Sequence, residues 1–140
     1  MKKNPTQYWL VRFAPRRTNW DEIVARGLFT PRAIKNNLSR KNLMLMQVGD
    51  QVLFYQTEVA QGIVGLMLVA RIAYSDPVSV DPKWLTCDFS PDRTFTTNVN
   101  LATLRDNKLL AQSNVLKQPR IAVLQISKAM FDEVLLLEEK

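Results

Sequence analysis

Histidine is absent from this 140-residue chain, and cysteine occurs only once, at Cys87. Because histidine is the commonest general base near neutral pH, its absence excludes a Ser-His-Asp triad and a Cys-His pair. A single cysteine cannot form an intramolecular disulfide, and without histidine the usual zinc ligand sets cannot assemble. Asp88 follows Cys87 and disfavours its thiolate, so we expect a structural cysteine. The chain is expected to use no metal and no cofactor.

Long apolar runs are also missing. The longest, residues 63–70, has eight residues and includes Gly65, whereas about 20 are needed to span a bilayer. The first apolar segment follows Lys2 and Lys3 but is short and interrupted by Arg12, which is unlike a signal peptide. The Walker A, GxGxxG and HExxH motifs do not occur, so no phosphate loop or zinc-protease helix is indicated. We expect a cytoplasmic protein with no membrane partner.

Positive charge is concentrated at the start of the chain. Residues 1–45 hold ten basic and two acidic side chains, a balance of +8, whereas the remaining residues hold nine basic and 11 acidic ones, a balance of −2. Clustered Lys and Arg gain affinity for polyanions by displacing counterions from phosphates. The N-terminal third therefore favours a nucleic-acid partner, with an ordinary soluble basic surface as the alternative.

The distribution of β-branched and aromatic residues predicts strands over residues 7–13, 51–57, 62–74, 84–89 and 120–126, with Gly65 marking a bulge or bend. Residues 90–100 are expected to be irregular. These strands do not alternate with helices in a βαβ pattern. We therefore expect a single α+β domain over residues 1–140, either a small β-barrel or a curved sheet with helices against it. A monomer or weak dimer is expected.

Helix signals are local and specific. A first short helix is predicted to begin after Asn19 and to end at Gly27. Thr30-Pro31 predicts the start of a second helical stretch that runs to Met46. That stretch is either one kinked helix or two short ones, with Ser39 capping the second. Asn100 is expected to cap a helical turn over residues 101–104, and Ser127 to cap a final amphipathic helix.

Aromatic and cationic side chains suitable for nucleic acid occur together in the first half. Tyr and Trp rings offer faces on which bases stack, and Arg and Lys neutralise phosphates. We expect Trp20 and Trp84 to belong to the core. Tyr8 and Trp9 are adjacent on a strand, so they point to opposite faces and only one can reach a given pocket.

Several short motifs follow one another in an order typical of one family. They are Tyr8-Trp9-Leu10, a basic stretch holding Asn36 and Arg40, Val48-Gly49-Asp50, Leu53-Phe54-Tyr55, Gly62-Ile63-Val64-Gly65 and residues 73–77. In order and spacing the chain resembles the EVE domain of the PUA-like superfamily. The resemblance covers nearly the whole chain and is tightest over residues 30–77.

The resemblance implies a PUA-like β-barrel of about five to six mostly antiparallel strands with short helices packed around it. It also implies a pocket for a flipped, often modified, base of DNA or RNA. The pocket positions carried over by matching are Trp9, Arg12, Lys35, Asn36, Arg40, Tyr55, Gln56 and Thr57.

The chain departs from the family pattern around this pocket. The family's Lys-Ser-Glu-Pro reads Arg12-Phe13-Ala14-Pro15, its Trp falls near Pro31, its Tyr-Gln pair becomes Asn37-Leu38, and its His-Ser becomes Gln56-Thr57. These changes affect the stacking face and the polar groups that read a base edge. They bear on ligand identity rather than on the fold.

Three hypotheses follow. In the first, the protein is a non-enzymatic reader in which Trp9 or Tyr55 walls a base pocket and Asn36, Gln56 and Thr57 contact the base edge. In the second, it is an ASCH-type hydrolase of a modified nucleoside that uses Lys35, Thr57 and Glu58. In the third, it is an interaction module whose pocket no longer binds a ligand.

Overall fold

The computed structural model describes residues 5–15, 18–32, 34–58, 61–81 and 84–138. Five strands form one sheet in the order β4-β3-β2-β1-β5. β1 and β2 are parallel and the other neighbours are antiparallel. The strands are β1 (Tyr8–Phe13), β2 (Gln51–Gln56), β3 (Gly62–Ser75), β4 (Leu85–Asn100) and β5 (Val123–Ile126).

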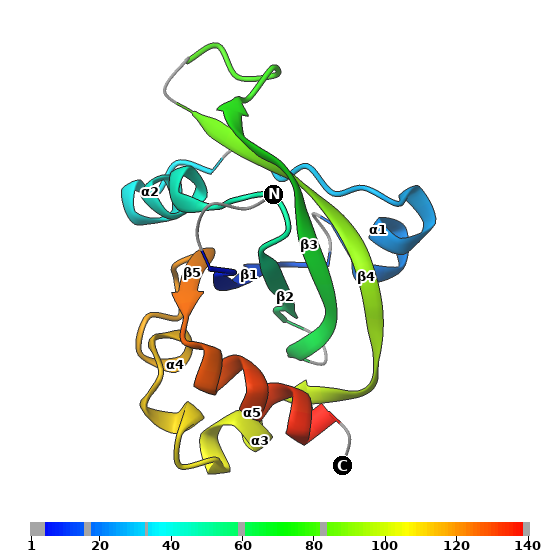
Figure 1. Cartoon of the computed structure of the whole chain (residues 1–140), viewed down its shortest axis with the longest axis vertical. Helices are drawn as coiled ribbons and strands as arrows, with labels where there is room; N and C mark the ends of the chain where they lie inside the picture. The colour runs from blue at the N-terminus through cyan, green and yellow to red at the C-terminus, as the bar shows by residue number, and fades with distance from the viewer. Residues whose placement is uncertain (1–4, 16–17, 33, 59–60, 82–83, 139–140) are drawn as a thin grey trace.

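The prediction of an α+β fold with mostly antiparallel strands is confirmed, whereas barrel closure is not seen among the described strands. Figure 1 shows β3 and β4 as a long, strongly bent pair that curves across the molecule. β4 and β5 are the two ends of the strand order and do not pair with each other in the described part of the chain. Helix α5 contacts β4 and helix α2 contacts β5.

The helices cover both faces and one end of this sheet. In Figure 1, α1 lies to the right and α2 to the left of the long strands, while α3, α4 and α5 gather at the end nearest the C-terminus. Buried residues of α1 and α2 belong to the same core cluster and so cover the same face. Among the described residues, no helix is long and apolar enough to cross a membrane. The helices are α1 (Trp20–Arg26), α2 (Asn37–Leu45), α3 (Leu101–Asp106), α4 (Asn114–Lys117) and α5 (Lys128–Glu138), with a short 3-10 helix, η1 (Leu110–Gln112).

The predicted capping roles of Asn19, Gly27, Asn100 and Ser127 are confirmed. The Asn19 side chain accepts the Glu22 N–H, and Gly27 adopts a left-handed conformation with φ 71° that ends α1. The Asn100 side chain caps α3, and the Ser127 hydroxyl oxygen accepts the Met130 N–H in the first turn of α5. Each of these bonds joins residues three apart, so neighbouring sequence is enough to specify them.

Successive side chains of β1 point alternately to two buried clusters, one on each face of the sheet. Trp9, Val11 and Phe13 point to the face covered by α1 and α2, and Leu10 points to the face covered by α3, α4 and α5. Tyr8 packs with Leu10, as the opposite orientation of Tyr8 and Trp9 requires. The sheet is therefore buried on both faces at β1.

The predicted helix start at Thr30-Pro31 is wrong. The described residues between Gly27 and Asn37 are not helical, and Asn36 caps α2 by accepting the Ser39 N–H at 2.9 Å. Ser39 lies inside the helix, where its hydroxyl oxygen accepts the Val123 N–H. Thr30 and Pro31 bond instead to β4, so a tertiary interaction overrides the local signal.

The predicted irregular segment after Phe89 is also wrong, because β4 continues to Asn100. Pro91 lies within it and has no N–H to donate, which is tolerated because β4 is an edge strand, with β3 as its neighbour in the described sheet. The expected bulge at Gly65 is confirmed, since the register between β3 and β4 shifts between Ile63 and Gly65.

Candidate binding cavity

A cavity of about 430 Å³ opens beside the end of β1. Its volume falls within the range of about 300–1,000 Å³ typical of small-molecule sites. The described residues that line it come from the end of β1, from α1 and from the segment after it: Phe13, Thr18, Glu22, Ile23, Arg26, Leu28, Phe29, Thr30, Pro31 and Arg32.

Helix α1 is held in place by Trp20. Its indole N–H donates to the Thr94 hydroxyl at 2.8 Å, which ties the helix to β4. A Cβ atom on Gly65 would lie 2.2 Å from the Trp20 ring, so only glycine allows the ring to pack this closely against β3. With Trp20 fixed in the core, Glu22 and Arg26 of the same helix line the cavity.

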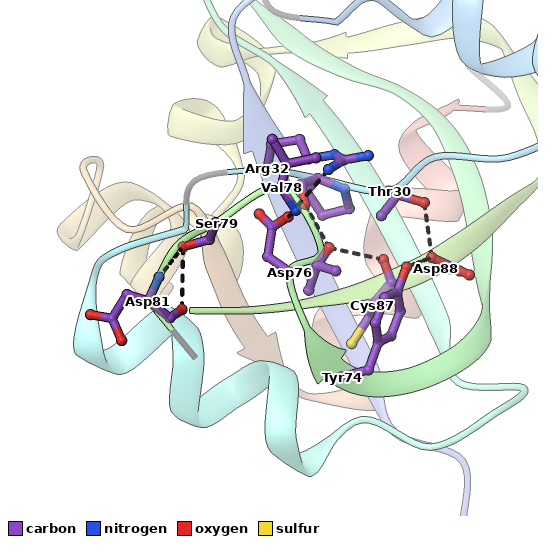
Figure 2. Close-up of polar contacts among 11 residues, drawn as sticks. Thr30, Arg32, Tyr74, Asp76, Val78, Ser79, Asp81, Cys87 and Asp88 are labelled. Carbon is purple, nitrogen blue, oxygen red and sulfur yellow. Dashed lines mark hydrogen bonds and ion pairs between the residues drawn. The ribbon is translucent and has the colours of Figure 1, made fainter. Parts of the chain in front are cut away.

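The wall at Phe29 and Thr30 is bonded to β4. Phe29 and Phe89 exchange two backbone hydrogen bonds of 2.8 and 2.9 Å. One residue further along, the Thr30 hydroxyl donates to the Asp88 carboxylate at 2.8 Å, and Tyr74 donates to the same oxygen at 2.5 Å. Figure 2 shows Thr30 and Tyr74 reaching Asp88 from two different segments.

The bonding continues along the same wall. The Pro31 carbonyl accepts the Thr86 hydroxyl at 2.6 Å. The Arg32 guanidinium forms an ion pair with the buried Asp76 at 3.2 Å, and Asp76 also accepts the Val78 N–H at 3.0 Å. Four consecutive residues, 29–32, are therefore each bonded to β4 or to the turn that precedes it. Figure 2 shows Thr30 and Arg32 making two of these contacts.

The buried part of the cavity is aromatic and its rim is charged. Phe13 and Phe29 are 6% and 8% exposed and meet edge to face with ring centroids 5.3 Å apart. Arg26, Arg32 and Glu22 supply the charges. An apolar ring fits against phenyl groups, and an anion fits against guanidinium groups. In the described part of the chain, no three acidic or cysteine side chains group as a metal site would require.

Trp9 lies in the core rather than at the cavity. It is fully buried, and its indole N–H donates to the Asp50 carboxylate at 3.0 Å. Its ring therefore offers no face to a ligand in this structure.

Arg12 and Tyr55 are brought together, but on the opposite face of the sheet. The Arg12 guanidinium donates to the carbonyl oxygens of Val115 and Gln118 at 2.9 and 3.3 Å, and it lies 5.6 Å from the Tyr55 ring centroid. Burial lowers the pKa of Arg12 and raises the pKa of Tyr55. The pair fastens the sheet to α4.

The residues predicted around α2 do not converge. Lys35 places its ammonium 4.6 Å from the Trp84 ring centroid, Asn36 caps the helix, and Arg40 donates to Asn37. Trp84 is partly exposed and so is not the core residue expected, unlike Trp20.

Gln56 and Thr57 both adjoin Phe13, which lines the cavity. Gln56 pairs with Phe13 in the register of β1 and β2, and the Thr57 N–H donates to the Phe13 carbonyl at 3.0 Å. None of the eight predicted residues is among those that line the cavity, and their binding role stays a prediction.

Sequence reasoning missed Phe13 and Pro31 as site residues although both were noted as departures from the family pattern. Both line the cavity. The signal that finds Phe13 is alternation: Trp9 and Phe13 are four residues apart and share a face, whereas Arg12 is three residues from Trp9 and does not. Two of the departures therefore lie in the lining of the cavity.

One family model and several solved structures match this chain. The model of the EVE domain matches residues 7–137. A hypothetical protein of Leishmania major is 25% identical, with a TM-score of 0.89 and 96% of both chains covered. A protein of Rhodopseudomonas palustris is 27% identical, with a TM-score of 0.87 and coverage of 92% of this chain and 90% of that one.

The human THYN1 protein, solved in complex with DNA that contains 5-methylcytosine, is 23% identical over 96% of this chain and 99% of that one. Its TM-score is 0.88, which shows the same fold. The comparison with curated proteins gives no match.

Proposed function

Because this chain belongs to the EVE domain family, we propose that it is a cytoplasmic nucleic-acid reader that holds a flipped, modified base of DNA or RNA in the cavity beside α1. The observation that carries the proposal is the cavity itself. It combines a buried aromatic part, Phe13 and Phe29, with a cationic rim at Arg26 and Arg32.

The chemistry of the lining fits a base joined to phosphate. Unstacking a base costs a few kcal/mol, and contact with aromatic rings restores about 1 to 3 kcal/mol per base. Glu22 accepts hydrogen bonds when ionised, so it suits an exocyclic amino group at a base edge. Arg26 and Arg32 suit the phosphates on either side.

The choice of a first ligand follows from a relative. The human THYN1 protein was solved with DNA that contains 5-methylcytosine, so that base is the natural first probe. The net positive charge of residues 1–45 adds electrostatic attraction to the nucleic-acid backbone. Four of those basic residues, Lys2, Lys3, Arg16 and Arg17, lie outside the described residues.

We infer binding without catalysis. The hydrolase alternative needs Lys35 to act with Thr57 and Glu58, but the Lys35 ammonium lies over Trp84, whereas the Thr57 backbone bonds to the end of β1. Incubation with an acylated cytidine should release no product. Release that depends on Lys35 would overturn this view.

We further infer that the curved sheet is the wall of a PUA-like barrel and that the protein is a monomer or weak dimer. Sedimentation over a range of concentrations tests the second inference. A stable higher oligomer would contradict it.

The decisive experiment measures binding of labelled oligonucleotides, with cytosine or 5-methylcytosine at one position, as DNA and as RNA. We expect binding that weakens steeply between about 50 and 200 mM salt and that favours the modified base. Leu28→Trp fills the cavity from an exposed lining position and should abolish the preference.

The matched control is Leu45→Trp, which makes the same change at an exposed position of α2 that does not line the cavity. It should bind as the wild type does. No binding at low salt, or equal binding by Leu28→Trp and the wild type, would contradict the proposal.

A further inference from the structure

A second hollow, of about 250 Å³, lies next to the cavity on the far side of Arg32. We call it the outer hollow. It is lined by Arg32, Asp76, Val78, Ser79 and Trp84. Arg32 lines both the cavity and the outer hollow, so the two spaces adjoin at this side chain.

The outer hollow is built on a well-bonded turn. The Asp76 carboxylate, with 3% of its side chain exposed, accepts the Val78 N–H at 3.0 Å and pairs with Arg32. The Asp76 N–H donates to the Trp84 carbonyl at 2.8 Å, and the Ser79 N–H donates to the Asp76 carbonyl at 3.1 Å. Figure 2 shows Arg32, Asp76 and Val78 meeting at this turn. The Trp84 backbone and the Arg32 side chain are thus both bonded to Asp76.

The lining has the composition of a stacking platform. Trp84 is partly exposed, and the Lys35 ammonium lies 4.6 Å from its ring centroid. Val78 is 72% exposed beside it and adds apolar surface. Proteins that bind single-stranded nucleic acid combine an aromatic face for the base with cations that follow the backbone. Here the cations are Lys35 and Arg32.

We propose that the outer hollow binds the nucleotide next to the flipped base, with its base stacked on Trp84. The proposal rests on the function proposed for the cavity and adds a second subsite to it. The phosphate that joins the two nucleotides meets Arg32, whose side chain is 48% exposed while it keeps its ion pair with Asp76. Its five N–H donors allow both contacts at once. Lys35 meets the next phosphate.

The test uses short oligonucleotides that carry 5-methylcytosine and either an intact neighbour or an abasic neighbour. An abasic site keeps the phosphates and removes only the base. The wild type should bind the intact probe about 5- to 150-fold more tightly, as expected for one stacked base. Placing the abasic site 5′ or 3′ of the modified base then identifies which neighbour is stacked.

Trp84→Ala should lose this difference and bind both probes as the wild type binds the abasic one, while Trp84→Phe should keep most of it. A spectroscopic readout is available because Trp9 and Trp20 are 0% and 4% exposed. Quenching of tryptophan fluorescence by the intact probe should therefore come from Trp84 and disappear in Trp84→Phe.

Equal binding of the intact and abasic probes by the wild type would overturn the subsite proposal. So would a preference of Trp84→Ala for the intact probe. In either case, a preference for 5-methylcytosine over cytosine would still support base binding in the cavity. Absence of any binding at low salt would overturn both. Unfolding curves for Trp84→Ala and Trp84→Phe establish that each variant is folded under the binding conditions.

Discussion

The Thr30 hydroxyl donates to the Asp88 carboxylate at 2.8 Å and so joins the cavity wall to β4. Thr30→Val removes this donor while keeping the shape of the side chain. We expect the free energy of unfolding to fall by about 1 kcal/mol, and affinity for the modified oligonucleotide to fall severalfold because the wall loosens. Urea unfolding and fluorescence polarisation measure the two effects.

Thr97→Val is the control for this change, because Thr97 is an exposed residue of β4 that does not line the cavity. It should alter neither quantity. Unchanged ligand affinity in Thr30→Val would show that the wall does not depend on this bond.

Trp9 is expected to matter for stability and not for binding. Trp9→Phe removes one of the N–H groups that donate to the fully buried Asp50 carboxylate; Gln7 and Gln47 also donate to it. Loss of a donor to a buried acceptor costs about 1 to 3 kcal/mol. Tyr8→Phe, on the opposite face of β1, should cost much less. If Trp9→Phe lost oligonucleotide affinity without losing stability, the result would indicate that Trp9 takes part in binding.

Gly65 and Trp20 are predicted to be energetically coupled. Gly65→Ala places a Cβ atom against the Trp20 ring and should destabilise the protein by about 1 to 3 kcal/mol. Adding Trp20→Phe relieves the overlap, so the double variant should lose less stability than the sum of the single variants. Thermal unfolding of the four proteins tests this. Strict additivity would show that the cost of Gly65→Ala does not depend on the Trp20 indole.

Stability should fall in acid through Glu138. Its side chain is 3% exposed and accepts the Thr96 N–H at 2.9 Å and Arg93 at 2.5 Å. The Thr96 hydrogen bond holds the pKa of Glu138 below its ordinary value of 4.5, burial opposes this, and Arg93 reinforces it. A lowered pKa in the folded state stabilises the protein fully above pH 4.5. That contribution is lost as pH falls through the lower folded value.

Urea unfolding as a function of pH checks this expectation. Glu138→Gln should lower stability at neutral pH and flatten the decline below pH 4.5. Glu133→Gln, the same change on the same helix, controls for the loss of one negative charge. An identical decline in stability below pH 4.5 in Glu138→Gln and the wild type would contradict the role given to Glu138.

Cys87 should be unreactive in the folded protein. It is fully buried, and burial, with a further contribution from the neighbouring Asp88, raises the pKa of its thiol to about 12. A thiol reagent at about pH 8, close to the pKa of an ordinary cysteine, should modify the protein only after unfolding in urea. Fast modification of the native protein would mean that β4 opens readily.

Features that depend on adjacent residues were determined by the sequence itself. The caps of α1 by Asn19, of α3 by Asn100 and of α5 by Ser127 each need only a side chain and an N–H three residues away. The opposite orientation of Tyr8 and Trp9 follows from strand geometry. The absence of histidine likewise excludes a histidine-based triad whatever the fold.

Tertiary structure decided the rest, because the competing partners lie far along the chain. Thr30-Pro31 has the local form of a helix start, but its hydroxyl and carbonyl bond to Asp88 and Thr86, more than 50 residues away. Pro91 stays in a strand because β4 lies at the edge of the described sheet. The cavity joins Phe13, α1 and residues 28–32, and their meeting depends on Trp20 packing against Gly65 on β3. No pattern within one segment specifies contacts of that range.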